Sequence, residues 1–313
     1  MKRLLVLTGM GLIVLGATPG APQAPGRWTT AAPMPEQRSE VAVGELGGKL
    51  YVVGGIGGSA ALFEYDPQSD RWQKRAALPI GLHHAGAAAI GGLLYVVGGY
   101  TGGWNPVDTV FAYDPKSDRW TERARLSTPR GALAVAVLGG KLHALGGVGA
   151  DRRNTGAHDA YDPATDRWTA LPPLPTPRDH LAVGVVEGQL YAVGGRLDGN
   201  YGRNLAVNEE YAPATGRWRQ RAAMPGARSG IAAATLTGRL FVFGGEAPTG
   251  TFDRVDAYDP SQDAWTTWAP MPTGRHGLGA AAVGERVFVI SGGPTPGGSA
   301  SSRNEVFVPA VPR

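Results

Sequence analysis

The stretch that decides the fold is Lys49-Leu50-Tyr51-Val52-Val53-Gly54-Gly55. Five related segments follow along the chain, each a short apolar run ending in a glycine pair or, in the last copy, in Ser-Gly. The first residue of that pair stands at positions 54, 98, 146, 194, 244 and 291, so the gaps are 44, 48, 48, 50 and 47 residues. A nearly constant period of this size predicts a repeat protein in which each repeat is one structural unit.

The first five repeats carry further signals in the same order. A Tyr-Asp-Pro turn follows the glycine pair and a tryptophan follows the turn, as in Tyr65-Asp66-Pro67 and Trp72. The equivalent tyrosines and tryptophans are Tyr113 and Trp120, Tyr161 and Trp168, Tyr211 and Trp218, and Tyr258 and Trp265. In this combination the chain resembles the Kelch-repeat family over almost everything after residue 26. The resemblance implies a β-propeller with four strands per blade.

The residues themselves favour the same all-β fold. The repeated runs are short, rich in β-branched and aromatic residues and bounded by glycine, which is typical of buried strands. Trp28 belongs to an outer strand with no partner strands before it, and residues 304–308 form a third strand with no fourth after it. We therefore predict six blades of four antiparallel strands, closed by the N-terminal strand joining the last blade.

Residues 1–24 differ from the repeats. Lys2 and Arg3 precede an apolar run over 4–16 and then small residues and prolines, which is the layout of a secretory signal peptide. The alternative is a retained membrane anchor, although 13 apolar residues are fewer than the roughly 20 that a span needs. We expect an exported protein, periplasmic or secreted, with one propeller domain over 25–313. The absence of cysteine excludes a cysteine-linked lipid anchor and disulfides.

One face of the predicted propeller carries the candidate ligand-binding residues. The loops that precede each innermost strand and those that follow each glycine pair share this face, and they are the longer and more varied connections. Sixteen residues before each pair lie Arg38, Leu82, Arg130, Arg178, Arg228 and Arg275. Five arginines at a channel mouth predict a basic funnel for an anionic ligand. The alternative is that each arginine is part of the repeat pattern and pairs within the structure.

His83, Tyr100 and Arg196 are further candidates for ligand contact, because they adjoin the same positions. Histidines at 83, 84, 180 and 276 all fall near the start of innermost strands. Neighbouring residues on a strand point to opposite faces, so we expect His83 and His84 to diverge. We predict no metal site and no cofactor, and we interpret the repeated Asp-Pro-x-x-Asp segments as turns.

These observations favour a binding protein that recognises a protein segment or a carbohydrate, and they leave open whether it is an enzyme. The net charge of +4 and the lack of a lysine-rich run argue against a nucleic-acid partner, and we expect a monomer. An alternative comes from Gly245-Glu246-Ala247 and Arg254, which resemble functional residues of Kelch-type N-acetylneuraminate epimerases at a longer spacing. That resemblance implies proton transfer by Glu246 and carboxylate binding by Arg254 or the other arginines. A structural role at the cell surface is a third possibility.

Overall fold

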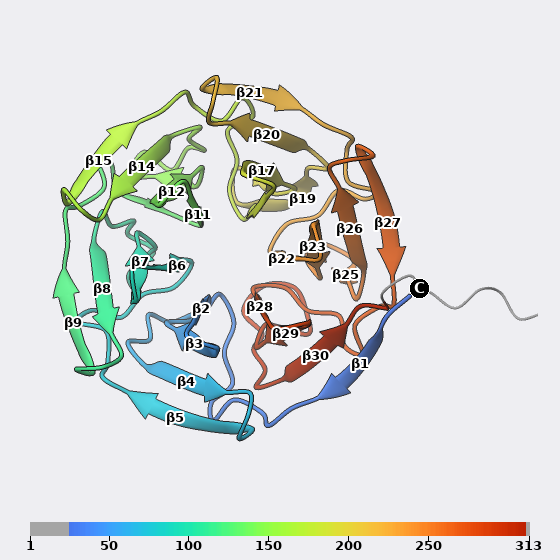
Figure 1. Ribbon diagram of the computed structural model, residues 1–313, viewed down its shortest axis with the longest axis horizontal. Helices are drawn as coiled ribbons and strands as arrows, with labels where there is room; N and C mark the ends of the chain where they lie inside the picture. Colours follow the sequence, from blue (N-terminus) through green and yellow to red (C-terminus); the bar gives the residue numbers. More distant parts are fainter. Residues whose placement is uncertain (1–24, 311–313) are drawn as a thin grey trace, which may run out of the picture.

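Six four-stranded antiparallel sheets surround a central axis in residues 25–310, the part of the chain that the computed structural model describes (Figure 1). Each sheet is one blade. The strands of blades 1 to 3 are β2 (Ala42–Leu46), β3 (Lys49–Val53), β4 (Leu62–Asp66) and β5 (Arg71–Arg75); β6 (Gly86–Ile90), β7 (Leu93–Val97), β8 (Val110–Asp114) and β9 (Arg119–Glu122); and β11 (Ala134–Leu138), β12 (Lys141–Leu145), β14 (His158–Asp162) and β15 (Arg167–Ala170).

Blades 4 to 6 complete the circle. Their strands are β16 (Ala182–Val186), β17 (Gln189–Val193), β20 (Asn208–Ala212) and β21 (Arg217–Gln220); β22 (Ala232–Leu236), β23 (Arg239–Phe243), β26 (Val255–Asp259) and β27 (Ala264–Trp268); and β28 (Gly279–Val283), β29 (Arg286–Ile290), β30 (Asn304–Val308) and β1 (Arg27–Thr30). The predicted six-bladed all-β propeller is confirmed. The described residues contain no helix, and so none that could cross a membrane. The predicted signal peptide over 1–24 lies outside them.

The N-terminal strand closes the propeller as expected. β1 pairs antiparallel with β30 in the register Trp28↔Phe307, so the two ends of the described chain share blade 6 (Figure 1). The Trp28 indole also donates from Nε1 to the Ala269 carbonyl at 2.9 Å, which ties blade 6 to blade 5. Closure thus gives blade 6 the same four strands as the other blades.

The same tryptophan contact joins every pair of neighbouring blades. At the first junction Trp72 Nε1 donates to the Ala32 carbonyl at 2.8 Å, while the Ala32 amide donates to Asp70 at 2.8 Å. The Tyr65 hydroxyl donates to the same Asp70 oxygen at 2.6 Å. The Asp-Pro-x-x-Asp segments are thus turns whose last carboxylate reaches the preceding blade, with Asp70 at a left-handed φ of 53°.

Packing at the axis depends on small residues. The β3 segment Leu50 to Val53 is buried throughout, because both faces of a blade are covered by its neighbours. The innermost strands are richer in alanine and glycine, as in β6. A Cβ at Gly86 would lie 2.3 Å from Val135 of the next blade, so only glycine allows this approach.

Three short two-stranded sheets lie outside the blades. They pair β10 (Arg130–Gly131) with β13 (Val148–Gly149), β18 (Arg196–Leu197) with β19 (Asn200–Asn204), and β24 (Glu246–Ala247) with β25 (Gly250–Thr251). Isolated bridges such as His83↔Tyr100 and Asp179↔Arg196 join the residues before the innermost strands to those after the glycine pairs. These two sets of loops share one face, here called the loop face.

Candidate functional site

Six residues at equivalent repeat positions close the axis at the loop face. They form the axial ring, which consists of Glu40, His84, Ala132, His180, Gly230 and Gly277. All six have a left-handed φ between 51° and 63°, and each backbone amide donates to the carbonyl of the equivalent residue in the preceding blade over 2.7–3.1 Å. The closed circle of bonds occupies one amide and one carbonyl from each residue. The side chains of the axial ring therefore decide what the axis can bind.

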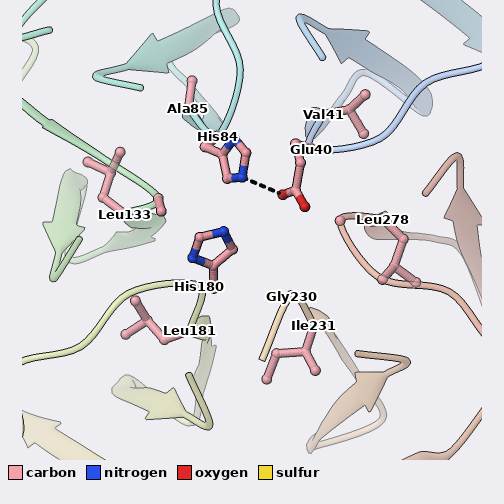
Figure 2. A pocket seen from close by; sticks show the side chains of 12 residues that line it. Glu40, Val41, His84, Ala85, Leu133, His180, Leu181, Gly230, Ile231 and Leu278 are labelled. Atoms are coloured by element: carbon pink, nitrogen blue, oxygen red, sulfur yellow. Dashed lines mark ion pairs between the residues drawn. The ribbon is translucent and has the colours of Figure 1, made fainter. Parts of the chain in front are cut away.

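Glu40, His84 and His180 supply the polar side chains of the axial ring and point toward one another across a cavity of about 90 Å³ (Figure 2). His84 Nε2 lies 3.2 Å from Glu40 Oε2, and the His84 and His180 rings are 4.8 Å apart between centroids. Burial lowers the pKa of His84 to about 3. Burial alone would raise the pKa of Glu40, but His84, His276 and His180 outweigh it and hold that pKa well below its ordinary value.

A larger cavity of about 460 Å³ opens beside the axis and is here called the loop-face cup. Its wall includes Tyr100, Trp104, Arg152 and Arg196, and His180 lines both cavities. The Trp104 side chain is 52 % exposed, more than any other large hydrophobic side chain of residues 25–310. The Trp104 ring packs against His83 at 4.7 Å between ring centroids. The cup thus combines an exposed aromatic face with cationic groups.

Arg196 connects the cup to a buried polar cluster. Its guanidinium donates to Glu246 Oε1 at 2.7 Å and to Asp179 Oδ1 at 3.2 Å, and its Nη2 lies 2.7 Å from His180 Nε2. Asp179 also lies 2.5 Å from His180 Nδ1. Burial raises the pKa of Asp179, but the hydrogen bond to His180 and other partners outweigh it and lower that pKa to about 2.

Comparison with known proteins identifies the fold family. A family profile described as the KLHDC2/KLHL20/DRC7 Kelch-repeats domain matches residues 25–195, more than half of the chain. The chain belongs to the Kelch-repeat family. The Kelch motif also matches residues 177–225 and 227–272. The solved structure of YjhT has the same fold as this Kelch protein, with a TM-score of 0.78 at 17% identity, covering 88% of this chain and 96% of that chain. No curated protein matches the sequence.

The Kelch propeller supports a binding or interaction role, but its five arginines lie inside the blades. Arg178 donates to Glu209 of β20 at 2.6 Å and to two carbonyls of its own blade. The corresponding pairs are Arg130 with Asp159, Arg228 with Asp256 and Arg275 with Glu305. Arg38 contacts Glu36 and donates to the Gly54 carbonyl. None of the five lines the axial cavity or the cup, so the structure does not assemble the expected basic funnel from them.

Some of the other predicted site residues lie in the loop-face cup or in the polar cluster around Arg196, and one lies elsewhere in this Kelch propeller. Tyr100 and Arg196 line the cup, and Glu246 is buried beside Arg196. Arg254 instead donates to Asp256 at 2.7 Å and does not meet Glu246.

The expectation that His83 and His84 diverge is wrong. Their Nδ1 atoms lie 2.5 Å apart, because the left-handed φ of 53° at His84 breaks the alternation of a strand. Glu40, Asp179 and Trp104 were missed by sequence reasoning, and His180 was noted only as a histidine near the start of an innermost strand. The position two residues after each repeat arginine is alanine or glycine in three repeats, but it is Glu40, His84 or His180 in the others. This difference between repeats was the sequence signal that could have identified the three residues.

Proposed function

We propose that this Kelch protein binds a carbohydrate in the loop-face cup. The observation that carries the proposal is Trp104, whose exposed indole stands beside a cavity of about 460 Å³. That volume lies within the range of about 300–1,000 Å³ that is usual for small-ligand pockets. An aromatic face packs well against the C–H face of a sugar ring, and a guanidinium binds hydroxyl or carboxylate oxygens.

Arg152 favours an acidic sugar over a neutral one. It lies on the wall of the cup, it is exposed, and its side chain makes no ion pair within residues 25–310. Arg196, by contrast, is already bound to Glu246 and Asp179. A guanidinium without a protein carboxylate can pair with the carboxylate of a ligand in bidentate fashion.

A thermal-shift and calorimetric screen of acidic and neutral sugars, sialic acid included, tests the proposal. A ligand that binds only the folded state raises the melting temperature. We expect Trp104→Ala to weaken binding about tenfold or more, which corresponds to about 1.4 kcal/mol. Arg152→Ala should weaken acidic sugars selectively.

Arg254→Ala is the matched control, because it removes an arginine that lies outside the cup. It should leave sugar affinity unchanged. If no sugar binds and the same face captures a peptide segment, the ligand is a protein and the carbohydrate proposal is wrong.

A second candidate is anomer exchange of the bound sugar, and the position of Glu246 favours it. Its carboxylate is buried in the same cluster as Arg196 and His180, although Arg254 is not there. A positioned carboxylate can move a proton in ring opening. NMR exchange spectroscopy of a sugar that binds would decide: faster exchange that Glu246→Gln removes without loss of binding supports the enzyme, and unchanged exchange supports binding alone.

A further inference from the structure

The side chains of Glu40, His84 and His180, here called the axial triad, have the arrangement of a metal site. They come from three different blades and converge on the axis because they occupy the same repeat position (Figure 2). One donor atom from each lies within 4.8 Å of the other two. A tetrahedral ion with bonds of about 2.0–2.2 Å holds neighbouring ligand atoms about 3.3 Å apart. The 3.2 Å between His84 Nε2 and Glu40 Oε2 fits that spacing.

The hydrogen bonds around His84 leave a lone pair directed at Glu40. His83 Nε2 lies 3.0 Å from the Thr101 carbonyl, which can only accept, so this nitrogen carries the proton. In a neutral His83 the Nδ1 atom is then an acceptor, and its partner 2.5 Å away, His84 Nδ1, is the donor. His84 Nε2 consequently has no proton and faces a carboxylate oxygen.

Two lone pairs that face each other need a cation between them. A metal ion satisfies both atoms at once, since it accepts the lone pair of a neutral imidazole and the charge of a carboxylate.

Each member of the triad also has an outer partner of the kind that orients metal ligands. His84 donates from Nδ1 to His83, and the distance of 2.5 Å between His180 Nδ1 and Asp179 fixes the Nε2 lone pair of His180 toward the axis. His276 Nδ1 lies 3.3 Å from the second oxygen of Glu40. Such partners set the tautomer and the direction of a ligating histidine.

The charges of the cluster favour an added cation. Within residues 25–310, the cluster contains one guanidinium, that of Arg196, and three carboxylates, those of Glu40, Asp179 and Glu246. A divalent ion at the triad would bring the cluster closer to neutrality.

We propose that the axial triad binds a divalent transition-metal ion of the zinc class, through His84 Nε2, His180 Nε2 and a Glu40 carboxylate oxygen. Two imidazoles and one carboxylate suit zinc rather than magnesium or calcium, which prefer oxygen ligands. To bind the same ion, His180 has to move toward His84 and Glu40 and release its contact with Arg196. Arg196 would still be paired with Asp179 and Glu246.

Titration of zinc into tag-free protein stripped with a chelator tests this site by calorimetry, without any sugar. We expect one ion per chain, with a dissociation constant in the micromolar range or below and a rise in melting temperature. His84→Asn, His180→Asn and Glu40→Gln should each weaken zinc binding at least tenfold. Asparagine tolerates the left-handed conformation of these histidines, so both histidine variants are expected to fold.

His158→Asn is the matched control. His158 is also a buried histidine with a lowered pKa, and it bonds to His143 within blade 3, away from the axis. It should bind zinc like the parent chain. The proposal is overturned if the parent chain does not bind zinc, or if the three triad variants bind it as tightly as His158→Asn does. Neither result depends on whether a sugar binds in the cup.

Discussion

At the scale of single residues, burial decides what the arginines of the repeat can do. The Arg178 side chain is fully buried and contacts Glu209 at 2.6 Å. Its partner carboxylate and carbonyl acceptors hold this guanidinium inside the blade, away from the loop-face cup. The same position is occupied in blades 3, 5 and 6, so this ion pair belongs to the blade itself.

Arg178→Ala should therefore destabilise the fold and leave ligand binding by the folded protein unchanged. It leaves the Glu209 carboxylate buried without its cation, a change that costs about 3–5 kcal/mol. Urea denaturation measures the loss. The control is Arg125→Ala, which removes an exposed pair with Asp108 and should cost about 0–1 kcal/mol. If Arg178→Ala were as stable as the parent chain but bound an anionic ligand more weakly, the arginines would instead contribute to ligand binding.

At the scale of strands and turns, the junctions between blades differ in one informative place. At the second junction the Tyr113 hydroxyl donates to Asp118 at 2.6 Å, and the Ala76 amide donates to the same oxygen. Blade 4 has Gly216 where blades 1, 2, 3 and 5 have this aspartate, and its indole acceptor is the carbonyl of Pro172, which has no amide proton. In blade 4 the missing carboxylate and the missing amide donor therefore match, because Pro172 has no N–H that an aspartate could bind.

Tyr113→Phe and Tyr211→Phe should therefore have different effects. Tyr113→Phe removes a hydrogen bond to a partly screened carboxylate and should cost about 1 kcal/mol. Tyr211 has no such aspartate, so Tyr211→Phe should be close to neutral. Differences in melting temperature between the two variants measure this, because both substitutions remove one hydroxyl from a buried tyrosine. Equal losses would mean that the carboxylate contributes nothing to the junction.

At the scale of the whole molecule, the sequence was sufficient for the architecture and insufficient for the site. The glycine pairs, Tyr65 and its equivalents, and the tryptophans are local signals that recur in register, so the number of blades and the closure by Trp28 could be predicted. The axial triad combines one residue from each of three repeats, at a position where the repeats differ. Its geometry also depends on a left-handed backbone at His84, which strand alternation does not describe.

Closure of the circle by β1 is the feature on which the whole propeller depends, and a cross-link can test it. Arg27 and Val308 are paired in the β1–β30 register and are less buried than their neighbours Trp28 and Phe307. Side chains directly opposite each other in such a pair have Cβ atoms about 4.5–5.5 Å apart, near the separation that a disulfide needs. The chain contains no cysteine, so Arg27→Cys with Val308→Cys can form only the intended bond within one chain.

The oxidised double variant should melt well above the parent chain, and a reductant should abolish the gain. The bond closes a loop of nearly the whole chain, for which the entropic stabilisation is about 5 kcal/mol when no strain opposes it. If the two ends separate early in unfolding, the higher melting temperature arises because the disulfide prevents blade 6 from opening. Each single cysteine variant is the control and should melt like the parent chain. An oxidised variant that melts no higher than its reduced form would show that unfolding starts elsewhere and that β1 does not limit the stability of the closed circle.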